Sequence, residues 1–380
     1  MRIGINALAW VSNAQAGVDT YVRQLLNALQ QIDQANEYIV FVAGQAHGEL
    51  DLAAGNFREV ACPIPSRWQP VRALWEQIRL AHWVKAEAVQ VLLGIGGIVP
   101  TNLAIPAVQV IHDLQVFRYP ENFSWAKRKF LQMMLPCTAQ HAQLTIASSE
   151  YTRNEVVRFL PPQRADTRVA LLAGARGYEP AEPEAVTAAK HKYGVGERYL
   201  LNVATSHRHK NLQGLVAAWN QSSVDADVVL VGKRGSGHRE LMQEVATASC
   251  PGQIKLLGWI PQPELAALYT GATAFVLPSL LEGFGMTVLE AMQCGCPVAC
   301  SSLTALPEVV GQAALCFDPR RSEDFVAALD RISNDQLLRQ RLQQEGFARA
   351  RRFSWEQTAR TTVAALLEAG EQHAGRTGPG

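Results

Sequence analysis

The chain has 380 residues, of which 48% are hydrophobic and 18% charged, and its 35 Lys and Arg residues nearly balance 34 Asp and Glu residues. This composition excludes a mostly disordered chain, and the length favours two domains of roughly 150 to 200 residues each. The even charge argues against a module that binds nucleic acid through a strongly basic surface.

Cysteine usage and hydropathy indicate the compartment. The seven cysteines are irregularly spaced and lie mostly in apolar runs, which favours a reducing, cytoplasmic environment. No secretory leader is expected at the N-terminus. The long uncharged stretch 88–111 contains several Gly and Pro residues, so it predicts strands joined by a loop in place of a membrane helix.

Short β-branched runs alternate with helix-length segments along the chain. This alternation predicts parallel sheets with helical crossovers, an α/β fold. The first series of predicted strands is 2–8, 38–43, 89–93, 107–112, 144–148 and 169–172. The second series is 199–204, 228–231, 254–257, 273–277, 297–301 and 314–317.

The two series define two doubly wound, Rossmann-like domains. We expect an N-terminal domain at 1–175, a linker at 176–196 that is rich in Pro, Gly and Ala, and a C-terminal domain at 197–355. Residues 356–380 are expected to form a helix that returns to the first domain, followed by a frayed polar tail. Such domains bind ligands at the carboxyl ends of their strands, so a cleft between them is the expected active site.

The clearest motif follows the strand predicted at 273–277. Gly283 and Gly285 let the backbone approach a ligand closely, and a helix is predicted to begin at Met286, which builds an anion site at the strand end. Glu282 lies in this loop and Glu290 about one turn into the helix. The two carboxylates are therefore placed to flank a diphosphate and to bind hydroxyl groups on either side of it.

This Glu-x7-Glu element and the segment that follows it resemble glycosyltransferase family 4, the retaining nucleotide-sugar transferases with the GT-B fold. The resemblance covers nearly the whole chain and is strongest over 199–319. It implies that Glu290 holds the ribose of the donor and that Glu282 contacts the donor sugar as a catalytic residue. Gly283, Phe284, Gly285 and Met286 complete the implied donor-binding loop.

Two cations follow the first strand of the second domain. Lys210 matches the phosphate-binding lysine of the family, and Arg208 stands in for an arginine that the family carries earlier in this loop. In the first domain, His112 ends a buried strand and resembles the catalytic histidine near the sugar, while Asp113 either orients its imidazole or caps the next segment. Gly17 precedes an amphipathic helix and matches the family's glycine loop beside the diphosphate; the role of Asp19 is open.

The resemblance implies a metal-independent hexosyltransferase with no cofactor, which moves a sugar from a nucleotide donor to a hydroxyl of a glycan or lipid-linked acceptor. The segments 231–235 and 302–311 resemble bacterial mannosyl- and rhamnosyltransferases of surface-polysaccharide assembly, including lipopolysaccharide, and favour GDP-mannose or a related deoxysugar donor. A GT-B hydrolase or epimerase, or a non-catalytic nucleotide-sugar-binding subunit, stays open. No G-x-G-x-x-G array supports a dinucleotide-dependent dehydrogenase.

The segment 123–135 combines a basic cluster with aromatic and apolar residues. It predicts either peripheral contact with the inner face of an anionic membrane or an ordinary core helix with a solvated basic face.

Overall fold

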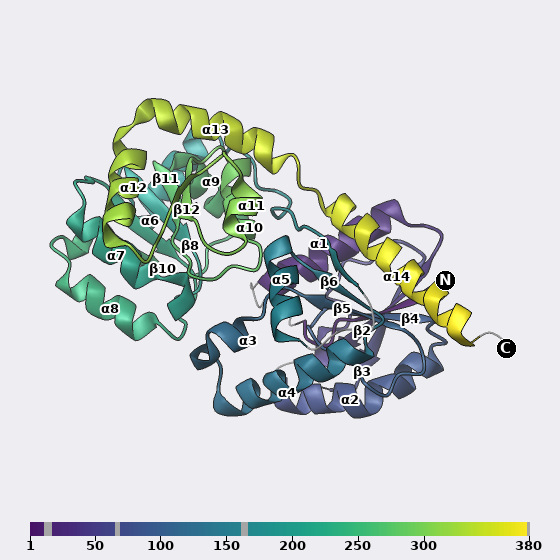
Figure 1. Cartoon of the computed structure of the whole chain (residues 1–380). Coiled ribbons are helices and arrows are strands. Elements are labelled where there is room, and N and C mark those ends of the chain that lie inside the picture. The colour runs from purple at the N-terminus through teal and green to yellow at the C-terminus, as the bar shows by residue number, and fades with distance from the viewer. Residues whose placement is uncertain (11–16, 65–68, 161–165, 378–380) are drawn as a thin grey trace. The chain divides into compact units, whose positions relative to one another are not determined.

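The computed structural model describes residues 1–10, 17–64, 69–160 and 166–377. The chain forms two compact units, each with its own parallel sheet flanked by helices (Figure 1). Unit 1 comprises Met1–Leu172 and Ser354–Gly380, and unit 2 comprises Ala173–Phe353. This confirms the predicted pair of Rossmann-like α/β domains. That the two domains face a common cleft stays a prediction.

In the described part of unit 1, seven parallel strands form one sheet in the order β3-β2-β1-β4-β5-β6-β7. The central strands are continuous apolar runs because helices cover both faces of the sheet, and β5 is buried along its whole length. The strands are β1 (Arg2–Asn6), β2 (Glu37–Ala43), β3 (Phe57–Cys62), β4 (Val91–Gly94), β5 (Ala107–Ile111), β6 (Leu144–Ala147) and β7 (Thr167–Val169).

The helices of unit 1 include one from the C-terminal end of the chain. Helix α14 lies along α1 in Figure 1 and packs on β4, β5 and β6, so the last segment of the chain completes the core of the first unit. The helices are α1 (Gly17–Ile32), α2 (Gln69–Ala86), α3 (Gln115–Arg118), α4 (Trp125–His141), α5 (Glu150–Phe159) and α14 (Trp355–Thr377), with short 3-10 turns η1 (Gly44–Ala46) and η2 (Pro120–Asn122).

Among the described residues of unit 2, six parallel strands have the order β10-β9-β8-β11-β12-β13. They are β8 (Tyr199–Val203), β9 (Asp227–Val231), β10 (Ile254–Leu257), β11 (Ala274–Leu277), β12 (Val298–Ser301) and β13 (Leu315–Phe317). The helices are α6 (Pro183–Tyr193), α7 (Leu212–Gln221), α8 (His238–Thr247), α9 (Gln262–Gly271), α10 (Met286–Gln293), α11 (Leu306–Val310), α12 (Ser322–Asn334) and α13 (Gln336–Ala350), with 3-10 turns η3 (Arg208–Lys210) and η4 (Pro251–Gln253).

Three segments differ from the sequence-based expectation. Strand β3 was not predicted, and the strand predicted at 169–172 lies earlier, at Thr167–Val169. The polar segment that begins at Glu371 continues α14 as far as Thr377. Within the described residues, none of the helices combines the length and the apolar character needed to cross a bilayer.

Each sheet reverses its strand order once. In unit 1 the reversal lies between β1 and β4, and in unit 2 between β8 and β11. Connections on the two sides of such a point leave the sheet toward opposite faces, which opens a crevice at the carboxyl ends of the strands. The loops that follow these four strands are therefore the candidate ligand-binding loops.

Helix α14 generates a stability prediction. Trp355 is buried against Tyr21 of α1, with ring centroids 5.9 Å apart. Trp355→Ala should lower the free energy of unfolding in urea by about 3 to 5 kcal/mol, because it leaves a cavity in the unit 1 core. The control Leu337→Ala, at a side chain that is 79% exposed on α13, should change it by less than about 0.5 kcal/mol. Equal effects of the two substitutions would show that α14 adds nothing to the core.

Candidate active site

The strand-order reversal of unit 2 brings a cation and a carboxylate together. Lys210 follows β8 and Glu282 follows β11, and Nζ of Lys210 lies 2.7 Å from Oε1 of Glu282. The Ser279 hydroxyl donates to the same oxygen at 2.7 Å. The backbone N–H of Leu280 donates to the carbonyl of His209, which ties the two loops to one another. The ion pair is thus held by both of the loops that flank the reversal.

A third loop also supports Glu282. The backbone N–H of Glu282 donates to the hydroxyl of Thr304 at 3.0 Å, and Thr304 follows β12. Thr304 adopts a left-handed backbone conformation with φ of 61°, which is unusual for a β-branched residue. The side chains of Lys210 and Glu282 are only 21% and 11% exposed. Their charges are therefore less screened than those of a surface ion pair.

The start of α10 depends on a glycine. Gly285 has a φ of 103°, and a Cβ at this position would lie 2.6 Å from the Leu306 side chain. The helix then begins at Met286, as the sequence predicts. Phe284 is buried and packs edge-on against Phe353, whereas Gly283 and Met286 are half-buried beside Glu282. The donor-loop residues expected from the sequence are thus adjacent to the ion pair.

Glu290 lies one turn further along α10 and is only 7% exposed. Burial raises its pKa from an ordinary value of 4.5 to about 7, and a hydrogen bond from the backbone of Ala175 partly offsets that shift. Gly174 allows this contact, because a Cβ there would lie 2.2 Å from Oε1 of Gln293. Within the part of the chain that the structure describes, no cation pairs with Glu290.

Arg208 is turned away from this cluster. Its guanidinium Nη2 lies 2.7 Å from Oε1 of Glu240 on α8, and its side chain is 44% exposed. The structure therefore brings Lys210, Glu282 and the start of α10 together, whereas Arg208 of η3 pairs with a residue of α8.

His112 lies at the corresponding edge of unit 1, directly after β5. Its ring contacts Tyr21 edge-on at 4.4 Å and hydrogen-bonds the backbone of Ile95, the residue after β4. Burial lowers the pKa of His112 to about 4, so the ring is neutral near pH 7. Its Nε2 atom is buried and has no hydrogen-bond partner among the described residues. Because the ring donates to Ile95 through its other nitrogen, Nε2 is left as an acceptor.

The remaining polar residues near this edge have structural partners. Gly17 begins α1 and is exposed; residues 11–16, which precede it, lie outside the described residues. Asp19 accepts hydrogen bonds from Nε1 of Trp10 at 2.6 Å and from Arg23 at 3.1 Å. Asp113 accepts from the backbone N–H of Gln115 and so caps α3.

One buried network was not predicted. Glu76 of α2 is 3% exposed, accepts from Nδ2 of Asn6 at the end of β1 and pairs with Arg72 at 3.0 Å. Oδ1 of Asn6 in turn accepts from the N–H of Leu8. The i,i+4 spacing of Arg72 and Glu76 was the only signal in the sequence. The network fixes the chain where it leaves β1 toward the ligand edge.

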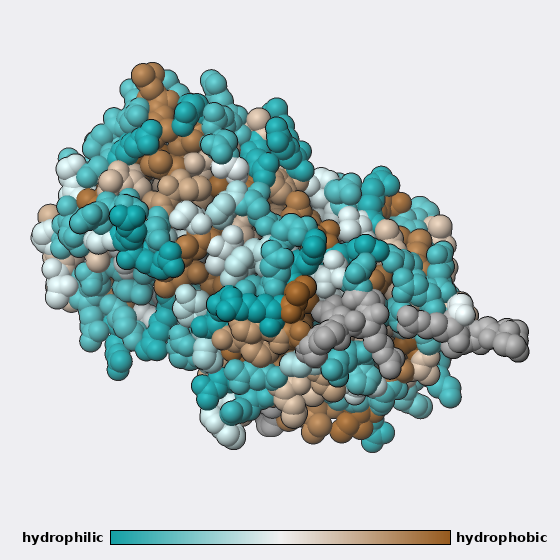
Figure 2. Space-filling model, viewed as in Figure 1, coloured by the Kyte–Doolittle hydropathy of each residue, from teal (hydrophilic) through white to brown (hydrophobic). Residues whose placement is uncertain are grey.

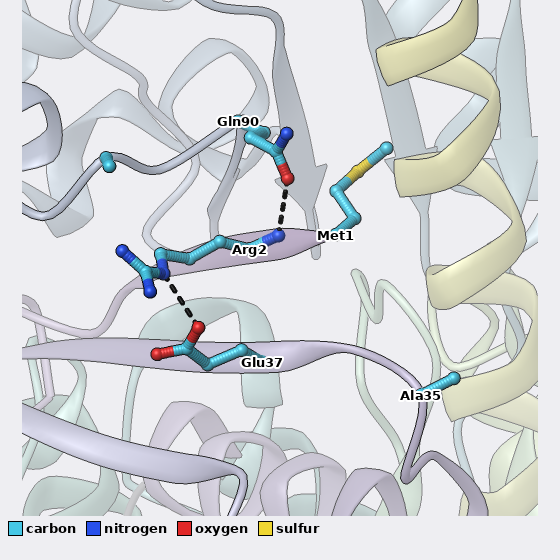
Figure 3. A pocket seen from close by; sticks show the side chains of 6 residues that line it. Met1, Arg2, Ala35, Glu37 and Gln90 are labelled. Carbon is cyan, nitrogen blue, oxygen red and sulfur yellow. Dashed lines mark hydrogen bonds and ion pairs between the residues drawn. The ribbon is translucent and has the colours of Figure 1, made fainter.

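A surface hollow lies at the opposite edge of unit 1. Met1, Arg2, Ala35, Glu37, Ala88 and Gln90 line it (Figure 3). Arg2 is held there by Glu37 at 2.8 Å and by Gln90 at 2.7 Å. The hollow is at the amino ends of β1 and β2, away from the edge where doubly wound sheets bind ligands, so we assign it a structural role. Among the described residues, no group of three His, Cys, Asp or Glu side chains is arranged to hold a metal ion.

Comparisons with known proteins agree on one family. Residues 16–171 match the model described as Glycosyltransferase Family 4, and residues 186–349 match the model described as Glycosyl transferases group 1. The O-antigen chain mannosyltransferase B of Escherichia coli is 34% identical over 68% of this chain and 69% of its own length. The serotype-specific mannosyltransferase WbdA of Escherichia coli is 28% identical over 69% of this chain, which spans 33% of that protein.

Two solved structures share the fold. Sucrose-phosphate synthase from Thermosynechococcus elongatus has a TM-score of 0.76 at 20% identity, with 99% of each chain covered. Anabaena Alr3699/HepE, solved in complex with UDP and glucose, has a TM-score of 0.75 at 18% identity, with 97% of this chain and 100% of that chain covered. Both support the assignment of two Rossmann-like domains as a GT-B fold.

The raised pKa of Glu290 predicts a pH-dependent cost to stability. A carboxyl whose pKa is higher in the folded chain than in the unfolded chain makes the fold more stable at low pH than at high pH. This contribution to the free energy of unfolding is lost as the pH rises from 4.5 through 7. Glu290→Gln should therefore raise the free energy of unfolding at pH 8 by about 1 to 3 kcal/mol and change it little at pH 5. Calorimetric melting at both pH values measures this.

The matched control is Glu184→Gln, at an exposed glutamate of α6, which should leave the pH dependence unchanged. Equal destabilisation of the Glu290→Gln variant at pH 5 and pH 8 would mean that the buried carboxylate is stabilised in the fold.

Proposed function

The chain belongs to the family 4 glycosyltransferases, and on this basis we propose that it transfers mannose or a related deoxysugar, with retention, from a nucleoside diphosphate donor to a hydroxyl of a glycan acceptor. The observation that carries the proposal is the Lys210–Glu282 ion pair at the strand-order reversal of unit 2, next to the helix that bears Glu290. The arrangement offers one cation and two carboxylates at the expected ligand edge.

The donor diphosphate binds at Lys210 and the start of α10. The ammonium group has three hydrogens, so it bonds a phosphate oxygen while it keeps its contact with Glu282. Backbone N–H groups of the first turn of α10 add partial positive charge on the same side. Arg208 joins them after leaving Glu240, because an exposed ion pair of this kind contributes little to stability. These groups stabilise the charge that develops on the leaving diphosphate.

The two glutamates hold different parts of the donor. Glu290 accepts hydrogen bonds from the ribose hydroxyls in addition to the one that it accepts from the backbone of Ala175. Glu282 contacts hydroxyls of the transferred sugar, in an orientation fixed by Ser279 and Lys210. In each contact, the two oxygens of an ionised carboxylate accept hydrogen bonds from hydroxyl groups.

His112, at the ligand edge of unit 1, is assigned to a sugar hydroxyl. Its neutral ring presents Nε2 as an acceptor, so it binds a sugar hydroxyl without placing positive charge near the reacting carbon. The acceptor hydroxyl attacks from the same face as the departing diphosphate, whose oxygen takes the proton, and no enzyme nucleophile takes part. Gly17, at the start of α1, is the residue that we assign to the donor diphosphate in this unit.

Two of the relatives guide the choice of substrates. Both are named as mannosyltransferases, one of them an O-antigen chain enzyme, which favours GDP-mannose as donor and a growing surface polysaccharide as acceptor. We infer that this acceptor is carried on a lipid at the inner face of the membrane. The proposal therefore includes peripheral contact with that face.

Transfer from GDP-mannose tests the proposal. The chain should release GDP only when a mannose-ended acceptor is added, and the rate should persist in excess EDTA because Lys210 and α10 stabilise the diphosphate without a divalent ion. Release without acceptor would indicate a hydrolase.

Two further outcomes would contradict parts of the proposal. Loss of activity that manganese or magnesium restores would reject metal independence. Stronger thermal stabilisation by UDP than by GDP would reject guanine as the donor base.

A second prediction separates the two glutamates. A ribose contact exists in the ground and transition states alike, so Glu290→Gln should raise the donor KM about 10- to 150-fold and weaken the binding of free GDP by a similar factor. Glu282→Gln should lower kcat by a comparable factor with nearly unchanged GDP affinity, since its partner is the sugar. Steady-state kinetics and calorimetric titration with GDP measure the two effects. The reverse pattern would mean that the two roles are exchanged.

A further inference from the structure

Helices α2 and α4 lie next to one another on unit 1. Ala73 of α2 and Leu135 of α4 belong to the same buried cluster, and Figure 1 shows the two helices side by side. Lys127 is close enough to Arg72 for the two positive charges to repel one another. The outer faces of the two helices therefore form one continuous surface.

That surface exposes large apolar side chains. Val71, Leu74 and Ile78 follow one another along a single face of α2 and are 47%, 58% and 58% exposed, and Trp125 and Met133 of α4 are 70% and 63% exposed. Figure 2 shows hydrophobic residues along the lower edge of unit 1, where Figure 1 places α2 and α4. Single exposed apolar residues are ordinary, but a cluster of this extent indicates a binding surface.

The same surface is strongly basic. The two helices carry six cations, Arg72, Arg79, Lys85, Lys127, Arg128 and Lys129, and a single carboxylate, Glu76. Glu76 is buried on the inner face of α2, where it bonds Asn6 and Arg72. Arg72 is therefore neutralised, and the outer surface offers the other five cations and no carboxylate from either helix, although the whole chain has a net charge of only +1.

Lys127 lies near a second cation and over an aromatic ring. Partial burial and the nearby Arg72 guanidinium both lower the pKa of its ammonium group, and the side chain lies over the ring of Phe123 at 5.4 Å. A cation held near another cation over an aromatic ring is stabilised when an anion approaches from outside. The surface thus favours an anionic partner that also accepts apolar side chains.

We propose that the outer faces of α2 and α4 form a docking surface for an anionic lipid bilayer. Val71, Leu74, Ile78, Trp125 and Met133 enter the headgroup region, and the cations contact lipid phosphates. A second copy of the chain does not fit, because it would bring two sets of five outer cations together. The inference extends the proposed function, in which the acceptor is carried by lipid, and it names the segment 123–135 together with α2 as the contact.

Vesicle binding tests the surface without any sugar transfer. The chain should co-sediment with vesicles that contain about one third phosphatidylglycerol and bind pure phosphatidylcholine vesicles far more weakly. Because each Lys or Arg near such a surface contributes about a fivefold change in binding, Lys127→Gln, Arg128→Gln and Lys129→Gln together should weaken binding about 100-fold. Leu74→Ser combined with Ile78→Ser should weaken it about 10-fold or more.

Matched controls come from unit 2. Leu337→Ser combined with Met242→Ser removes two exposed apolar residues, and Arg341→Gln, Arg351→Gln and Arg352→Gln remove three exposed cations. Neither control should change vesicle binding. Circular dichroism and GDP-mannose turnover with a soluble acceptor establish that all variants are folded.

The outcomes separate this inference from the proposed function. Unchanged vesicle binding by both docking variants, or an equal loss in the unit 2 controls, would overturn the docking surface even when transfer is normal. A change in sedimentation mass on Leu74→Ser and Ile78→Ser without loss of vesicle binding would assign the surface to a protein contact and overturn the proposal. Vesicle binding as predicted, with no transfer from any nucleotide sugar, would leave the docking surface in place and reject the transferase function.

Discussion

The candidate site depends on a single topological constraint, the reversal of strand order within each parallel sheet. In unit 2 the reversal forces the loops after β8 and β11 apart at one edge, and the chain bridges that opening with the Lys210–Glu282 ion pair. The hydroxyls of Ser279 and Thr304 then bond the side chain and the backbone of Glu282. In unit 1 the corresponding opening lies beside Ile95, which holds the His112 ring. Polar groups gather at these edges because strand ends alone leave the buried sheet.

Burial shifts the pKa values of two of these groups in opposite directions. Desolvation raises the pKa of the Glu290 carboxyl to about 7 and lowers the pKa of the His112 imidazole to about 4, so in each case the neutral form is favoured. The neutral forms limit the cost of burial below pH 7, but Nε2 of His112 is left without a hydrogen-bond partner among the described residues. A ligand hydroxyl supplies that partner, and further ligand hydroxyls add to the hydrogen bond that Glu290 accepts from the backbone of Ala175. The buried polar groups of Glu290 and His112 thus lower the stability of the fold and favour ligand binding, as is expected of functional polar residues.

The sequence predicts the sheets and part of the site, and the limits have physical causes. A strand such as Ala274–Leu277 is recognisable because burial on both faces requires a continuous apolar run, whereas Phe57–Cys62 includes Arg58 and Glu59 because it lies at the edge. The start of α10 follows from its glycines. Other contacts join segments that are far apart in the chain. Arg208 pairs with Glu240 of α8, and residues 174 and 175 pack over α10. No local pattern encodes such contacts, so only the folded structure reveals them.

Helix α2 shows why whole-chain charge is a poor guide to surface charge. Its inner face buries Ala73, Glu76 and Leu80. Glu76 is the only acidic residue of the helix, and its carboxylate bonds Asn6 at the end of β1. The cations of the outer face are then left without acidic neighbours on their own helix. A chain that is neutral overall thus acquires a basic surface because its carboxylates are committed elsewhere, to buried networks and to pairs such as Arg208–Glu240. Since one helix carries both faces, the residues that shape the end of β1 also fix the position of the basic, apolar surface relative to the candidate site of unit 1.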